Sequence, residues 1–125
     1  MTSIPSPNED ERNWAMAAHL TALLGALAGG IPGFLGPLVI LLVKGGESRF
    51  VREHAAAALN FQLSLLIYGL ISVVLAVLTL GLGLLVLLPV WAIIAIVGAV
   101  FLIQGMLAAR DGRPYDYPLT LPLVS

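Results

Sequence analysis

The chain contains no cysteine and few charged residues. The lack of cysteine excludes disulfides, thiolate catalysis and cysteine-ligated metal sites. Only 10% of the residues are charged, whereas a typical soluble domain has about 25%. The net charge is −1, and no basic cluster is interleaved with aromatic residues. We therefore expect no nucleic-acid partner.

Sequence signatures of common enzymes are also missing. Glu53 and His54 are followed by alanines, which is not the His-Glu-x-x-His pattern of zinc proteases. Neither a Gly-x-Ser-x-Gly nucleophile motif nor a phosphate-binding glycine loop occurs. We predict that the protein is not an enzyme, with no catalytic residue, no metal site and no cofactor.

Hydrophobic residues make up 59% of the 125 residues and form long uninterrupted runs. The longest stretch without Asp, Glu, Lys or Arg covers residues 54–109, far more than the roughly 20 residues that one membrane crossing needs. The six basic and seven acidic side chains fall in three short stretches, residues 9–12, 44–53 and 110–116. This distribution predicts a polytopic membrane protein.

Glycine and proline divide the apolar runs. They predict turns at residues 29–33 and 79–83 and a helix end at residues 111–114. The fold class that follows is an all-α transmembrane bundle of four helices. Residues 32–44 reach only about 20 Å as a helix, so the second helix either crosses fully or is short and re-entrant. The predicted helices cover about residues 12–28, 32–44, 51–78 and 84–109.

These helices form one transmembrane domain, residues 12–125, after a disordered N-terminal segment of residues 1–11. That segment is polar and contains Pro5 and Pro7. It lacks a basic region followed by an apolar one, so we expect no cleaved signal peptide.

The basic residues predict the orientation of the bundle. With four helices, all six lie on one side of the membrane. With a single kinked helix over residues 14–43, Arg12 lies opposite the others. The positive-inside rule favours the first arrangement and places both termini in the cytoplasm. The six are Arg12, Lys44, Arg49, Arg52, Arg110 and Arg113.

A few polar residues within or beside the apolar runs are the candidates for a working site. An ionisable group inside a membrane is costly and suggests a function, so His19 is either a proton relay, a metal ligand or a hydrogen-bonded structural residue. Amides can bond across helices and fix their packing. The alternative is one cytoplasm-facing pocket for a lipid headgroup, an ion or a peptide segment. The pocket candidates are His19, Glu53, His54, Asn60 and Gln62.

Four aromatic residues are candidate anchors at the membrane–water interface, where Trp and Tyr are enriched. They are Trp14, Trp91, Tyr115 and Tyr117.

Three segments together resemble a known family. Residues 12–20 read RNWAMAAHL, residues 50–62 read FVREHAAAALNFQ, and residues 112–118 read GRPYDYP. They resemble a prokaryotic family of small four-helix membrane proteins of unknown function. That family is distantly similar to the twenty-kilodalton component of the chloroplast inner-envelope import translocon. The resemblance covers about residues 12–124 and implies a four-helix bundle without an assigned activity.

The resemblance rests on a set of motif residues, and at Arg52 the family often has an acidic residue instead. The matched residues are His19, Glu53, His54, Asn60, Phe61, Tyr115, Tyr117 and Pro118.

Three functions are compatible with these observations. We predict a non-enzymatic scaffold or accessory subunit of a membrane complex, located in the lipid bilayer as a homo-oligomer or with other subunits. The alternative is a small oligomeric transporter or channel, as the likeness to the translocon suggests. The third is a lipid-acting enzyme with His54 and Glu53 as acid and base. In each case we expect a multi-pass protein of the prokaryotic inner or plasma membrane.

Overall fold

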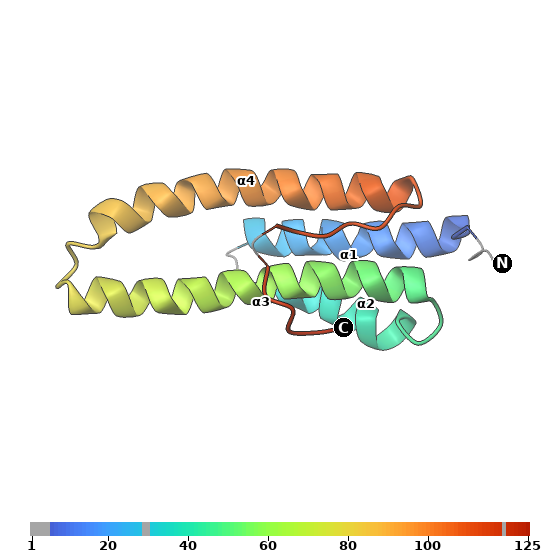
Figure 1. The fold of residues 1–125 in the computed structure, drawn as a ribbon, viewed down its shortest axis with the longest axis horizontal. Coiled ribbons are helices and arrows are strands. Elements are labelled where there is room, and N and C mark those ends of the chain that lie inside the picture. The colour runs from blue at the N-terminus through green and yellow to red at the C-terminus, as the bar shows by residue number, and fades with distance from the viewer. Residues whose placement is uncertain (1–5, 29–30, 119) are drawn as a thin grey trace.

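The computed structural model describes residues 6–28, 31–118 and 120–125, and in these residues the chain is helical without strands (Figure 1). The all-α, four-helix prediction is therefore confirmed. Residues 1–5 of the predicted disordered segment, and Gly29 and Gly30 of the first predicted turn, lie outside the described residues. The helices are α1 (Glu9–Leu27), α2 (Leu35–Lys44) after the short 3₁₀ helix η1 (Ile31–Phe34), α3 (Arg49–Leu78) and α4 (Leu84–Arg110).

The helix α1 begins three residues earlier than its predicted start at residue 12. The Asn8 side chain accepts a hydrogen bond from the backbone N–H of Glu11 at 2.7 Å. The Glu11 carboxylate accepts one from the backbone N–H of Asn8 at 3.2 Å. This reciprocal capping box satisfies two N–H groups that the helix end leaves free. Residues 9–11 are thus helical rather than part of a disordered segment.

The helix α3 begins two residues before its predicted start, because Ser48 caps it. The Ser48 hydroxyl accepts a hydrogen bond from the backbone N–H of Val51 at 3.3 Å. It donates its own hydrogen to Glu11 at 2.5 Å. This contact links the first turns of α1 and α3.

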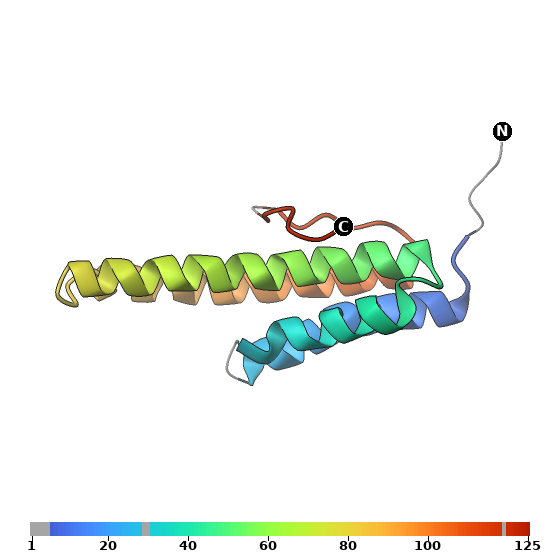
Figure 2. The same ribbon diagram turned by 90° about the horizontal axis from the view of Figure 1, so that it is seen from below.

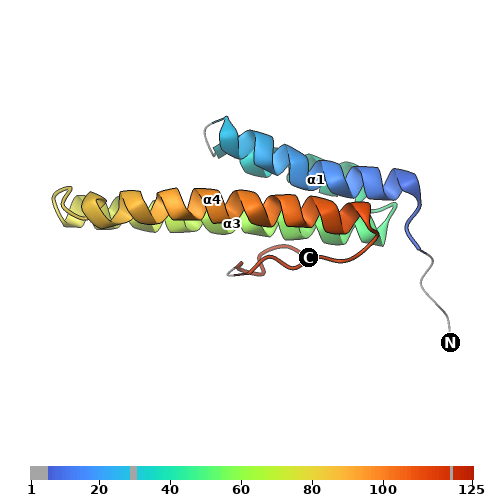
Figure 3. The ribbon, with the colours of Figure 1, turned by 90° about the horizontal axis from the view of Figure 1, so that it is seen from above.

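Two antiparallel hairpins of unequal length lie side by side (Figures 1 and 3). The α1–α2 hairpin ends about halfway along the longer α3–α4 hairpin (Figure 1). Since α2 has 10 residues, it is about 15 Å long, half of the roughly 30 Å of a hydrocarbon core. The second helix is therefore short, and its re-entrant path in a membrane stays a prediction.

The helices α3 and α4 are long and apolar enough to cross a membrane, with 30 and 27 residues. Only 17% and 11% of their most apolar windows are buried within the protein. The core helix of a soluble protein would be mostly buried instead. This exposed apolar surface, together with the length of the two helices, is what a membrane-embedded hairpin requires.

The three charged stretches lie at one end of the bundle. The start of α1, the α2–α3 connection and the end of α4 meet there (Figure 1). The opposite end is the uncharged α3–α4 turn, in which Leu80 and Gly81 have positive φ angles of 55° and 86°. The side chain of Leu80 is 93% exposed at this tip. The three charged stretches, which are far apart in the sequence, are thus neighbours in space at one end of the bundle.

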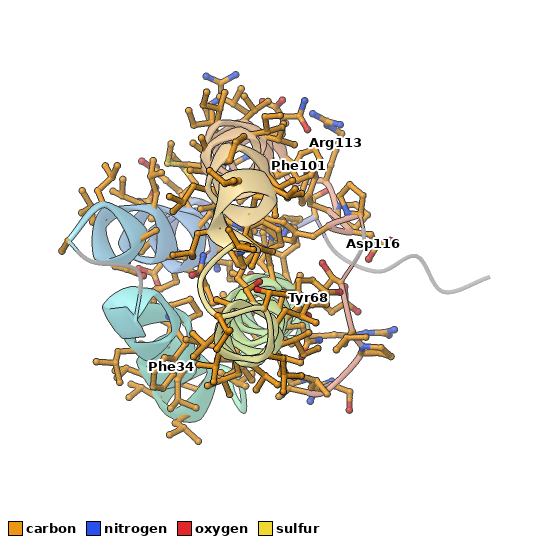
Figure 4. All side chains as sticks on the ribbon, turned by 90° about the vertical axis from the view of Figure 1, so that its left-hand side faces the viewer. Phe34, Tyr68, Phe101, Arg113 and Asp116 are labelled. Carbon is orange, nitrogen blue, oxygen red and sulfur yellow. The ribbon has the colours of Figure 1, made fainter. Side chains whose placement is uncertain are left out.

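After α4 the chain reverses at Gly112 and runs back along the bundle (Figures 1 and 2). The backbone N–H of Arg113 donates to the carbonyl of Ala108 at 2.8 Å, and that of Gly112 to Ala109 at 3.1 Å. With a φ of 74° at Gly112, this is the Schellman ending of a helix. We call residues 113–118 and 120–125 the tail. It covers the face of the α3–α4 hairpin opposite to α1 and α2 (Figure 4).

Candidate functional site

A chain of buried hydrogen bonds joins the tail to α3 and α1. The donor and the acceptor of each bond can be assigned in turn, starting from the end of the chain at Arg113. The residue His54 is 1% exposed. Its Nε2 atom lies 2.7 Å from the backbone carbonyl oxygen of Arg113. A carbonyl oxygen can only accept, so this nitrogen carries the hydrogen. In a neutral ring the other nitrogen, Nδ1, is then an acceptor.

The second histidine continues the chain. The Nε2 atom of His19 lies 2.8 Å from Nδ1 of His54 and must therefore donate to it. This leaves Nδ1 of His19 as the acceptor for the hydroxyl of Tyr117, with which it forms a short hydrogen bond. The bonds run from Tyr117 through His19 and His54 to the Arg113 carbonyl. Every nitrogen of the two fully buried rings has a partner, as buried polar groups require.

Small residues bring the helices close enough to make these bonds. A Cβ atom at Gly105 on α4 would lie 2.5 Å from Nδ1 of His19 and 2.9 Å from the hydroxyl of Tyr117. Glycine is needed at this position because the α4 backbone passes directly over both side chains. Buried alanines on α1 and α3 allow the same close approach. They are Ala15, Ala18, Ala22, Ala55, Ala56 and Ala58.

Aromatic rings surround the end of the chain at Tyr117. The Tyr117 ring stacks on Phe61 with centroids 4.6 Å apart and meets Tyr115 edge-on at 4.8 Å. Burial, with a smaller contribution from neighbouring Tyr115, raises the pKa of Tyr117 well above its usual range. Tyr117 was expected as an interface anchor, but it is 7% exposed and lies in the core. The reversal at Gly112 carries it back into the bundle.

The other three candidate anchors are each held by a neighbouring side chain. Trp14 is half-buried, and the ammonium of Lys44 lies 5.1 Å from its ring centroid. The indole N–H of Trp91 donates to Ser72 at 2.9 Å and so connects α4 to α3. The Tyr115 hydroxyl donates to Gln104 at 3.0 Å.

Asn60 lies on the tail-facing side of α3 and binds the tail backbone at two points. Its amide nitrogen donates to the carbonyl of Val124 at 2.8 Å. Its amide oxygen accepts from the N–H of the same residue at 2.7 Å. One turn further along, the hydroxyl of Ser64 accepts from the N–H of Leu121 at 2.8 Å. Asn60 and Ser64 thus recognise the extended tail through its backbone.

Gln62 lies apart from the other candidates, and Glu53 is on the outer side of α3, where it lines the same groove as Asn60. Gln62 is buried against η1, where a Cβ on Gly33 would clash with its side-chain oxygen. Its Nε2 has no hydrogen-bond partner in the described part of the chain. Glu53 is exposed and pairs with Arg49 at 2.9 Å.

The five pocket candidates therefore occupy several separate places. His19 and His54 are hydrogen-bonded to each other, whereas Glu53 and Asn60 line one groove beside the tail. Within the described residues, no group of three or more His, Asp or Glu side chains is arranged to hold a metal ion. Sequence reasoning missed Gly105 and the core position of Tyr117 as parts of the site. The GRPYDYP segment was the available signal, since it marks a chain reversal followed by two tyrosines.

The two apolar hairpins and the internally bonded polar chain define a small helical membrane protein. The chain belongs to the MamF/MmsF family, described as the magnetosome magnetite crystal formation protein family, and the match covers residues 10–124. This agrees with the expected small prokaryotic membrane family. The similarity to the chloroplast translocon component stays a prediction. No curated protein and no solved structure gives a significant match.

Proposed function

We propose that this protein is a non-enzymatic scaffold, an accessory subunit that acts by packing its helices in a membrane complex. The observation that carries this proposal is that His19 and His54 are bonded to each other and to the tail, and that Asn60 also binds the tail. Both nitrogens of His54 are engaged, and Glu53 is paired with Arg49 outside the core. General acid–base catalysis needs a group that is free to exchange a proton with a substrate, and these partners occupy both side chains.

The exposed surface supports the same proposal. The outer halves of α3 and α4 carry many exposed leucine, isoleucine and valine side chains, and lipid or another helix can cover them. Because lipid tails are as apolar as these side chains, association depends on close packing at small residues.

The proposed setting follows from the family. Its description names magnetite crystal formation, and a scaffold would contribute by organising proteins in the membrane where a crystal grows. We place the protein across the prokaryotic cell membrane, or a membrane derived from it, with both termini and the α2–α3 connection on the cytoplasmic side. The clustering of the basic residues at one end supports this orientation.

Cross-linking in native membranes, followed by purification in mild detergent and mass determination by light scattering, tests the scaffold proposal. We expect a discrete homo-oligomer or a stable complex with a constant set of partners, unchanged by Glu53→Gln. A monomer with no reproducible cross-linked partner would overturn the proposal.

A small oligomeric transporter or channel is the second candidate. It is favoured by the hydrogen-bonded chain of Tyr117, His19 and His54 within an apolar bundle, since such chains can pass protons. Proton flux into liposomes separates the two candidates. Flux that requires the reconstituted protein and disappears with His19→Phe would replace the scaffold proposal. Equal flux with and without the protein would remove the transporter.

A further inference from the structure

A groove of about 480 Å³ runs along the first three turns of α3, between that helix and the tail. Its charged lining residues are Arg49, Arg52 and Glu53 from α3 and Asp116 from the tail. Figure 4 shows Asp116 on the tail side of the bundle, away from α1 and α2. The groove is therefore separate from the buried histidine chain.

The charges in this groove leave one cation and one anion free. The guanidinium of Arg49 is paired with the carboxylate of Glu53 at 2.9 Å. The side chains of Arg52 and Asp116 are exposed. Within the described part of the chain they form no ion pair and no side-chain hydrogen bond. A ligand that carries both a negative and a positive group would match them.

The groove extends from the charged end of the bundle toward the apolar part. From Arg52 to Asn60 the axis of α3 advances about 12 Å, at 1.5 Å per residue. The deeper wall consists of Ala56, Ala57 and Val124, beside Asn60. The charged end of a membrane helix lies at the level of the lipid headgroups. The groove thus passes from headgroup level to the level at which acyl chains begin.

We propose that this groove binds the headgroup of an aminophospholipid of the phosphatidylethanolamine class. The phosphate lies on the guanidinium of Arg52, whose planar N–H donors suit phosphate oxygens. The primary ammonium donates to the carboxylate of Asp116, and the glycerol passes Ala56 and Val124. The choline headgroup has the same charges but no N–H to donate, and a glycerol headgroup lacks the cation. This lipid site does not depend on the scaffold function.

Native mass spectrometry of the full-length protein in detergent, titrated with defined lipids, tests the site. We expect phosphatidylethanolamine to bind about tenfold more tightly than phosphatidylcholine, the effect of one charge-assisted hydrogen bond at the low end of its usual range. Asp116→Asn should remove this preference. Arg52→Gln should weaken both lipids by a similar factor, and Arg52→Lys should weaken them less. Arg110→Gln is the matched control, because Arg110 is exposed at the same end but does not line the groove.

Several outcomes would overturn the proposal. Equal binding of the two lipids by the unaltered protein would do so, as would an unchanged preference in folded Asp116→Asn, checked by circular dichroism. Tighter binding of phosphatidylglycerol than of phosphatidylethanolamine would indicate a simple anion site instead.

Discussion

Nε2 of His19 donates a hydrogen bond to Nδ1 of His54 across 2.8 Å, and this single bond connects two tail contacts. His54 holds the beginning of the tail through the carbonyl of Arg113. His19 holds the tail four residues later through Tyr117. The histidine pair therefore fastens the tail to both hairpins. Its position in an apolar bundle makes each of these bonds costly to lose.

The alanine substitution Gly105→Ala should destabilise the fold. The added Cβ would lie 2.5 Å from Nδ1 of His19, so α4 and α1 must move apart. We expect a loss of about 1–3 kcal/mol in the free energy of unfolding, as for other overpacked cores. Gly69→Ala is the control, because its Cβ would meet only Trp91 at 4.0 Å. Unfolding in detergent, followed by circular dichroism, measures both, and equal stabilities would contradict the close approach.

The substitution Tyr117→Phe should destabilise the protein while preserving the ring packing. It removes the hydroxyl that donates to His19 and leaves a buried acceptor unpaired, which costs about 1–3 kcal/mol. Tyr115→Phe removes a more exposed hydrogen bond to Gln104 and should cost about 0.5 kcal/mol. A larger loss for Tyr115→Phe than for Tyr117→Phe, measured by the same unfolding assay, would show that the Tyr117 contact is unimportant.

Alkaline titration should show that Tyr117 ionises after Tyr115, because it is the more deeply buried of the two tail tyrosines. Its raised pKa means that the folded protein holds the phenol proton more tightly than the unfolded chain does. The stability linked to this group is complete below the ordinary pKa of about 10 and falls as the pH rises above that value. Tyrosinate absorbance should show a delayed step that Tyr117→Phe removes. If removing Tyr117 takes away a step near pH 10 while the protein stays folded, Tyr117 is not buried.

The topology was predictable because charge is expensive in a bilayer. The three charged stretches required both hairpins to begin and end on the same side, and the glycine-rich turns fixed where each helix reversed. The start of α1 was missed by three residues, because Asn8 and Glu11 form their capping box outside the apolar pattern. The path of α2 stayed open in the sequence, since residues 32–43 carry no charge and only their small number argued against a full crossing.

The site was less predictable because it depends on the tail. Helical periodicity places Asn60 and Ser64 on one side of α3, but it does not indicate that residues 121–124 return to meet them. From its sequence position alone, Tyr117 is predicted to lie at the membrane–water interface. Only the chain reversal at Gly112 shows that it returns into the bundle. Gly105 is one of several glycines in apolar helices, and nothing in its neighbours indicates that His19 lies across from it.

Nitrogen-15 NMR of the two imidazoles tests the buried hydrogen-bond chain most directly, because the nitrogen shifts report which ring nitrogen carries the hydrogen. Because the backbone carbonyl of Arg113 can only accept a hydrogen bond, His19 and His54 should both be neutral, and each should carry its hydrogen on Nε2. A scalar coupling across the bond from His19 to His54 should accompany these shifts. Hydrogen on Nδ1 of either ring, or rings that exchange rapidly with solvent, would contradict the chain and remove the main support for the scaffold proposal.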